Sequence, residues 1–207
     1  AFSGFNFLRL VDTYMDAFSK SSYFPLFFTV LMSLVGKQIY LRAVEKDDAG
    51  QVFLWENNPK NWKVSNTEVP FSMFDIIQLI EQQSDLRKSG QLRLVIMTQQ
   101  DKRAVGVIDL YDVNFKHGYA AVGILIAEDQ DKGKGIATEA LSLLIQYCQE
   151  ILELRNLYCQ IHGDNQASVA LFEKAGFLHA GTRTNWLRFK NQYFDELTYQ
   201  LCLENKN

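Results

Sequence analysis

The residues with the clearest potential for chemistry lie in one stretch, EDQDKGKGIATEA, from Glu128 to Ala140. A helix N-terminus leaves its first backbone N–H groups unpaired and carries positive dipole character. Glycines let such a backbone approach a large anion closely, and lysines add charge at the rim. The stretch therefore predicts a cradle for a phosphate-bearing ligand, although a tight turn with solvated lysines has the same pattern. The residues concerned are Lys132, Gly133, Lys134 and Gly135.

Two common phosphate-binding loops do not fit this stretch. The run GKGIA lacks the G-x-x-x-x-G-K-[ST] pattern. The G-x-G-x-x-G pattern fails as well, because Thr138 stands at the position of its last glycine. The predicted cradle is therefore of another type.

Hydrophobic periodicity predicts the elements that must position the cradle. Strands are expected at 39–42, 92–98, 104–113, 119–128, 154–162, 178–189 and 193–203. Helices are expected near 49–55, over 70–90 with Ser72 as N-cap, from 136 to about 151, and over 165–176. The unbroken apolar runs at 119–128 and 154–162 favour buried strands, the first with both faces covered. This order of elements predicts a single mixed α/β domain.

Composition limits the class of protein. The chain has 207 residues, 47% of them apolar, and a net charge of −3, which suits one globular domain with an appendage and not a nucleic-acid-binding protein. The three cysteines are far apart and lie in apolar segments, so we expect buried free thiols and a cytoplasmic protein. The three histidines lack ligand spacing, so no metal site is expected.

The first 36 residues differ from the rest and form an aromatic-rich arm or extension. No charge occurs between Lys20 and Lys37, but the apolar run is shorter than the ~20 residues that a membrane-spanning helix needs, and Pro25 interrupts it. Three interpretations stay open: a membrane-surface or export element, a packing or dimerisation arm that would make a homo-oligomer, and an upstream extension before Met32. The predicted division is 1–36 for the arm and 37–207 for the domain.

Two motifs in this domain resemble the GNAT superfamily of N-acetyltransferases. The acetyl-CoA signature [Q/R]-x-x-G-x-[G/A] is matched by Gln130, Gly133 and Gly135, followed by Ile136 and Ala137. A second block, NQASVALFEKAGF, resembles the family's N-x-x-[A/S]-x-x-L-[Y/F]-x-K-x-G-F. Its matching residues are Asn165, Ser168, Leu171, Phe172, Lys174, Gly176 and Phe177. The likeness covers roughly residues 37–205.

The resemblance implies the GNAT-type acyl-CoA N-acyltransferase fold: a mixed, mostly antiparallel sheet whose central strands splay apart, flanked by helices. The co-substrate would be acetyl-CoA. By the same resemblance, backbone groups of Leu125 and Ile126 would pair with the pantetheine amides, and backbone N–H groups from Gln130 to Ala137 would hold the pyrophosphate. Asn165 would contact the pantetheine or shape its wall, although a plain helix N-cap explains the same residue.

The amine that accepts the acetyl group, and the residues that would bind it, are inferred from the subfamilies that the sequence resembles most. LRAVEKDD, AVGVIDLYDVN and the second block look most like bacterial spermidine or diamine N-acetyltransferases, and they are also similar to ribosomal-protein N-terminal acetyltransferases. An alkyl ammonium group with a pKa of about 10.4 must be bound and then lose a proton before it attacks. By resemblance, the carboxylates that would bind the ammonium group and accept its proton are Asp109, Asp112 and Glu68.

Phe172 departs from a common form of the family, in which a tyrosine at this position protonates the departing thiolate. A phenyl ring donates no proton. Tyr111, Tyr119, Tyr158 or a water would have to substitute. We therefore expect an N-acetyltransferase acting on a small polyamine or diamine, with two alternatives: an enzyme for protein N-termini, and a catalytically weak relative that binds CoA.

Overall fold

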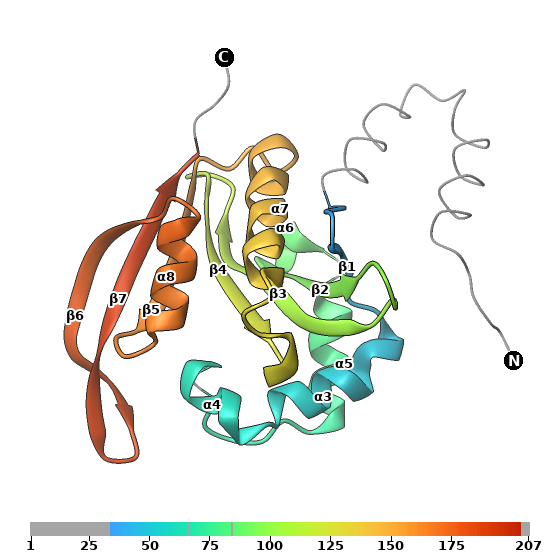
Figure 1. Ribbon diagram of the computed structural model, residues 1–207, viewed down its shortest axis with the longest axis horizontal. Helices are drawn as coiled ribbons and strands as arrows, with labels where there is room; N and C mark the ends of the chain where they lie inside the picture. Colours follow the sequence, from blue (N-terminus) through green and yellow to red (C-terminus); the bar gives the residue numbers. More distant parts are fainter. Residues whose placement is uncertain (1–33, 66, 84, 204–207) are drawn as a thin grey trace, which may run out of the picture.

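A computed structural model describes residues 34–65, 67–83 and 85–203 of the chain (Figure 1). The predictions for the arm lie almost entirely outside these residues. Within the described residues, no helix is long and apolar enough to cross a membrane.

One seven-stranded sheet organises the molecule, with strand order β1-β2-β3-β4-β5-β7-β6. All neighbouring strands are antiparallel except β4 and β5, which run parallel at the centre. The expected mixed, mostly antiparallel α/β fold is therefore confirmed. The strands are β1 (Ile39–Ala43), β2 (Leu92–Thr98), β3 (Ala104–Asn114), β4 (Tyr119–Ile126), β5 (Asn156–His162), β6 (Leu178–Phe189) and β7 (Gln192–Cys202).

The main core lies between one face of this sheet and two helices, α7 (Ile136–Glu150) and α8 (Gln166–Lys174). In Figure 1, α7 crosses in front of β3 and β4, and α8 lies in front of β5. Alternate strand residues point toward the helices, as the two-residue period of a strand requires. Ile108, Val122 and Leu157 are examples, each at most 2% exposed.

The opposite face of the sheet is covered by the segment between β1 and β2. This segment holds α3 (Ala49–Glu56), α4 (Pro59–Ser65), α5 (Met73–Gln82), α6 (Leu86–Ser89) and a short 3-10 turn η1 (Lys46–Asp48). Helices α3 and α5 share a small core of Ala49, Val52, Ile76 and Ile80. Trp55 of α3 packs on Val107 of the sheet, which anchors this layer.

The expected elements are present with three differences. Helix α4 was not predicted. The single helix expected over 70–90 is two helices, because the side chain of Asp85 accepts from the Lys88 backbone N–H and starts α6 as a new turn. The strand expected to be covered on both faces is buried from Ala120 to Val122, whereas Gly123–Ile126 is only half-buried. The site geometry explains the last difference.

Candidate active site

The central feature of the site is a gap that opens between the two parallel strands. β4 and β5 pair only at Tyr119–Ala121 with Asn156–Tyr158. β4 continues to Ile126 and β5 to His162. Each strand keeps its antiparallel partner on the outer side, β3 and β7 respectively. The sheet is therefore split into a V, whose narrow end lies at Ala121 and Tyr158, and the half-buried part of β4 lines it.

The glycine-rich stretch lies at the wide end of this V, where β4 leads through the 3-10 turn η2 (Asp129–Asp131) into α7. Gly133 and Gly135 have φ angles of 73° and 84°, which favour glycine, and Gly135 is the N-cap of α7. None of the backbone N–H groups from Gly133 to Thr138 donates a hydrogen bond to another described residue. A row of free donors at a helix N-terminus fits a pyrophosphate.

An ion pair fixes the shape of this cradle. The guanidinium of Arg103, from the β2–β3 hairpin, donates to both carboxylate oxygens of Asp131 at 2.8 and 2.9 Å. Asp131 is only 3% exposed, and its bond to Arg103 holds its pKa below the usual range of aspartate. At the rim, the Lys132 ammonium donates to Asp129 at 2.7 Å, whereas Lys134 and Gln130 are exposed.

The second motif forms the start and body of α8. Asn165 is the N-cap, and its side chain accepts from the Ser168 backbone N–H at 3.2 Å. Phe172 is 3% exposed and meets Phe177 edge to face at 5.0 Å. Asn165 and Phe172 therefore both have a structural role in α8, and the Phe172 ring cannot donate a proton at this position.

A buried donor also lies against the strand that lines the V. The indole Nε1 of Trp55 has no hydrogen-bond partner among the described residues. The Trp55 ring packs in a cluster with Ala127 and Leu125. Buried N–H groups are rarely left unpaired, and Trp55 Nε1 and Gln83 Oε1 are the two buried side-chain atoms without a partner among the described residues.

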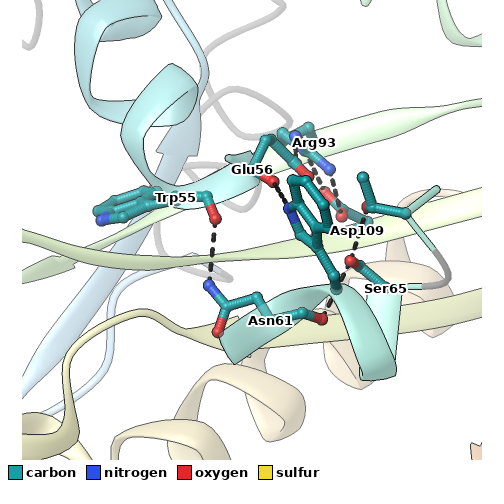
Figure 2. Close-up of polar contacts among 8 residues, drawn as sticks. Trp55, Glu56, Asn61, Ser65, Arg93 and Asp109 are labelled. Atoms are coloured by element: carbon teal, nitrogen blue, oxygen red, sulfur yellow. Dashed lines mark hydrogen bonds and ion pairs between the residues drawn. The ribbon is translucent and has the colours of Figure 1, made fainter. Parts of the chain in front are cut away.

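The predicted carboxylate Asp109 is held by an arginine that the sequence did not single out. Arg93 on β2 donates to Asp109 through Nε at 2.8 Å and Nη2 at 2.9 Å, and through Nη1 to Glu56 of α3 at 2.6 Å. Figure 2 shows the guanidinium between the two carboxylates. Burial acts to lower the pKa of Arg93, but the two carboxylates outweigh it and raise the pKa. The charge of Asp109 is therefore compensated within the protein.

The same close-up shows how α3 and α4 are joined. The Asn61 side-chain amide donates to the Trp55 carbonyl at 3.1 Å, and the Ser65 hydroxyl donates to the Asn61 carbonyl at 3.1 Å (Figure 2). The Trp62 indole N–H donates to the Glu56 carbonyl at 2.9 Å. These bonds fix the end of α3, and with it the Glu56 carboxylate that faces Arg93.

Asp112 has a different partner from Asp109. It is exposed, has a φ of 50°, and lies in a bulge of β3 where the pairing with β4 skips between Tyr111 and Asn114. Its carboxylate accepts a hydrogen bond from the Tyr158 hydroxyl at 2.6 Å. The described side-chain partner of Asp112 is therefore a hydroxyl and not a cation, at the narrow end of the V.

The structure does not bring Glu68 to the other two carboxylates. Glu68 is exposed in the segment between α4 and α5, and it has no hydrogen bond or ion pair with another described residue. A carboxylate that the sequence analysis missed is Glu196 of β7, which is 6% exposed and accepts from Arg183 at 2.6 Å and Gln160 at 3.2 Å. No cluster of His, Cys, Asp and Glu able to hold a metal occurs in the described part of the chain.

Comparison with known proteins agrees with this geometry. Residues 38–178 match the acetyltransferase (GNAT) domain family. A spermidine N(1)-acetyltransferase from Vibrio cholerae is 27% identical over 161 residues, covering 78% of this chain and 91% of the relative. The corresponding protein of Escherichia coli K12 is 24% identical over 165 residues, covering 80% and 85%.

Solved structures show the same fold. A spermidine N-acetyltransferase from Vibrio cholerae, in complex with CoA and spermine, has a TM-score of 0.74 at 24% identity, covering 81% of this chain and 96% of that one. A ribosomal L7/L12 alpha-N-protein acetyltransferase in complex with coenzyme A has a TM-score of 0.71 at 19% identity, covering 82% and 96%.

A sheet split between parallel strands, with an anion cradle at its wide end, defines an acyltransferase that uses coenzyme A. More specifically, the chain belongs to the GNAT acetyltransferase family, as the match over 38–178 shows. It is an N-acetyltransferase, and acetyl-CoA is the acetyl donor of this family.

Proposed function

We propose that the protein transfers an acetyl group from acetyl-CoA to a primary amine of a small polyamine or diamine such as spermidine. The observation that carries the proposal is the group of carboxylates on the face of the sheet that α3 covers, beside the V. Asp109 and Asp112 come from β3, and Glu56 approaches from α3. The likeness to spermidine N(1)-acetyltransferases supports the same substrate class.

In this proposal the V holds the pantetheine arm, with Leu125 and Ile126 offering backbone groups, and the cradle from Gln130 to Ala137 holds the pyrophosphate. Its N–H groups from Gly133 onward would do so, because those of Asp131 and Lys132 already donate to backbone carbonyls. Lys132 and Lys134 stand at the rim, and Asn165 and Phe172 belong to the second wall. The thioester supplies an activated acetyl carbonyl. The protein's task is to bind the ammonium, remove one proton, and present the neutral nitrogen to that carbonyl.

The three predicted carboxylates differ in their fitness for this task. Asp109 is already paired with Arg93, so its contribution is to orient and to add to the local field. Asp112 has no cationic partner among its described contacts and is the strongest candidate for binding or deprotonating the amine. Glu68 is exposed in the loop and is retained as a residue that would bind the far cationic end of a long polyamine.

The test is thiol release from acetyl-CoA with spermidine, spermine, putrescine, lysine and short peptides as acceptors. We expect release with polyamines and a loss of about 10²-fold in kcat/KM for Asp112→Asn, the usual lower range for a positioned base. Glu68→Gln should raise KM for spermidine more than for putrescine. Glu153→Gln is the control, because Glu153 is exposed in the segment between α7 and β5, beyond the closed end of the V.

Other outcomes would redirect the proposal. Release with peptides alone would make the protein an acetyltransferase of protein N-termini. Binding of acetyl-CoA without turnover on any amine would make it a catalytically weak relative, the alternative that Phe172 favours. We also propose a cytoplasmic location, since Cys148 and Cys159 are buried free thiols, although Cys202 is exposed and not buried as expected. We further propose a homo-oligomer formed through residues 1–36.

A further inference from the structure

The reaction needs an acid for the departing thiolate, and Phe172 leaves that role open. Phe172 lies in the main core against Phe177 and has no proton to give. Tyr111, Tyr119 and Tyr158 were equivalent substitutes on sequence grounds. The structure separates them by partner: the Tyr158 hydroxyl donates to a carboxylate, the Tyr119 hydroxyl accepts from the Asn114 amide at 3.4 Å, and the Tyr111 hydroxyl has no hydrogen bond to another described residue.

Tyr158 is at the narrow end of the V. It is the last residue of β5 that pairs with β4, opposite Ala121. A ligand whose phosphates occupy the cradle at the wide end would extend along β4 toward this end, so Tyr158 lies at the end of its path. The side chain alternates with those of the buried Leu157 and Cys159, and therefore points to the other face of the sheet, where α3 and the carboxylates lie.

The Tyr158 hydroxyl is also held by a carboxylate. It donates to Asp112 at 2.6 Å, and the Tyr158 ring meets Tyr119 edge to face at 6.2 Å. Asp112 is in the left-handed region, with a φ of 50°, at the bulge of β3. Bulges re-aim side chains beside active sites, and a non-glycine residue with positive φ carries a backbone cost that the surrounding structure must offset. The bulge turns the Asp112 carboxylate toward β5.

We infer that Tyr158 and Asp112 form the proton relay of the acetyl transfer, with Tyr158 as the acid that protonates the departing thiolate. The inference rests on the proposed function. It assigns Tyr158 as a catalytic residue and gives Asp112 a partner in its role as base.

The relay balances without any further reactant. The ammonium proton of the bound amine goes first to water. The neutral nitrogen then forms its bond to the acetyl carbon, and the carbon–sulfur bond breaks. The proton leaving the nitrogen goes to the Asp112 carboxylate, and the Tyr158 proton goes to the sulfur. Asp112 then returns its proton to the phenolate oxygen across the 2.6 Å hydrogen bond. From the neutral amine onward, amide and free thiol form with no net proton change and no oxidation.

The electrostatics follow the same order of events. Burial and the hydrogen bond to the Asp112 carboxylate raise the pKa of Tyr158, so the phenol stays protonated until the reaction begins. Once Asp112 has taken up a proton, its negative charge is gone and its new O–H donates to the phenol oxygen. Both changes make the phenol a stronger acid at the step where the thiolate leaves.

The test compares Tyr158→Phe, Asp112→Asn and the double variant, with thiol release measured at saturating acetyl-CoA and the best amine of the panel. Each single variant should lose about 10²-fold in kcat, the lower range for a positioned acid, because a thiolate leaves readily. The dissociation constant of CoA should change less than about twofold. The double variant should be no slower than the slower single one, because residues that act as one unit are not additive.

Three further variants test whether Tyr158, and not another tyrosine, is the acid. Tyr193→Phe, at an exposed phenol, should keep the wild-type kcat. A loss of kcat in Tyr111→Phe or Tyr119→Phe, with Tyr158→Phe as active as wild type, would overturn the relay and leave the proposed function intact. Additive losses in the double variant would also overturn it. If the wild-type protein turns over no amine at all, the proposed function fails and the relay falls with it.

Discussion

At the scale of single residues, Arg93 is the group whose loss should cost the most. Its guanidinium bridges Asp109 and Glu56, and the three side chains are only 14%, 22% and 12% exposed. Arg93→Met leaves two carboxylates in a poorly hydrated site without a counter-charge. We expect it to lower the free energy of unfolding by about 3–5 kcal/mol in a urea titration, the usual cost of breaking a buried pair.

Two controls separate charge from packing in that experiment. Lys46→Met removes an exposed pair with Glu81 and should leave the urea midpoint nearly unchanged. The triple change Arg93→Met, Glu56→Gln and Asp109→Asn removes all three charges and should recover most of the loss. If Arg93→Met were as stable as Lys46→Met, the bridge would have no role in holding α3 on the sheet.

These residue contacts show where sequence reasoning stops. The residues of the cradle and of the second motif could be predicted from the sequence, because each motif depends on the spacing of residues close together in the chain. The pairing of Arg93 with Asp109 depends on the register between β2 and β3, and the bond between Tyr158 and Asp112 joins residues 46 positions apart. No local pattern encodes either contact, so the sequence offered Asp109 as a site candidate but not the arginine that bridges it.

At the scale of elements, the β2–β3 hairpin holds the cradle through Arg103. Asp131→Asn removes the negative charge to which Arg103 is hydrogen-bonded. A hydrogen bond to a charged group typically contributes ~1.5–3 kcal/mol. We expect KM for acetyl-CoA to rise about 10-fold or more with kcat changed less than about twofold, in steady-state thiol release. Asp129→Asn, at an exposed position of the same turn, should change KM by less than about threefold.

The contribution of the ion pair between Arg103 and Asp131 to acetyl-CoA binding should change with pH in one direction. The pKa of Asp131 is lowered in the folded protein, chiefly by its bond to Arg103. Its contribution is therefore fully present above the ordinary pKa of aspartate, about 3.9, and is lost as the pH falls through the lowered value. The wild-type protein should therefore still bind acetyl-CoA more tightly than Asp131→Asn at pH ~5. If this advantage were already lost when the pH is lowered to ~6, the role proposed for the ion pair of Arg103 with Asp131 would be wrong.

Elements with strong periodicity were predictable, and elements held by side chains were not. β1 to β7 and α7 follow the apolar spacing of the sequence. Helix α4 begins with Pro59 in a polar stretch, and it is fixed by bonds such as that from Asn61 to the Trp55 carbonyl, which only the folded chain provides. The half-burial of β4 after Val122 likewise follows from the divergence of β5 and not from its own apolar sequence.

At the scale of the whole molecule, the V divides the sheet into two parts, β1–β4 and β5–β7–β6. They are joined by three residue pairs of β4 with β5 and by the core under α7 and α8. A ligand in the V contacts both parts and therefore binds the folded chain in preference to the unfolded one. At a CoA concentration 100 times its dissociation constant, this linkage stabilises the fold by about 2.7 kcal/mol.

The corresponding shift in melting temperature is roughly 5–10 °C for a chain of this length, measured by thermal denaturation with and without CoA. Gly135→Val should abolish most of the shift, because the residue that caps α7 has a φ of 84° and a β-branched side chain cannot adopt it without strain. Gly181→Val, at an open position in β6, should keep the shift, since nothing lies within 4 Å of a Cβ atom added there. A shift produced equally by ATP or NAD would show that the V does not recognise the pantetheine arm.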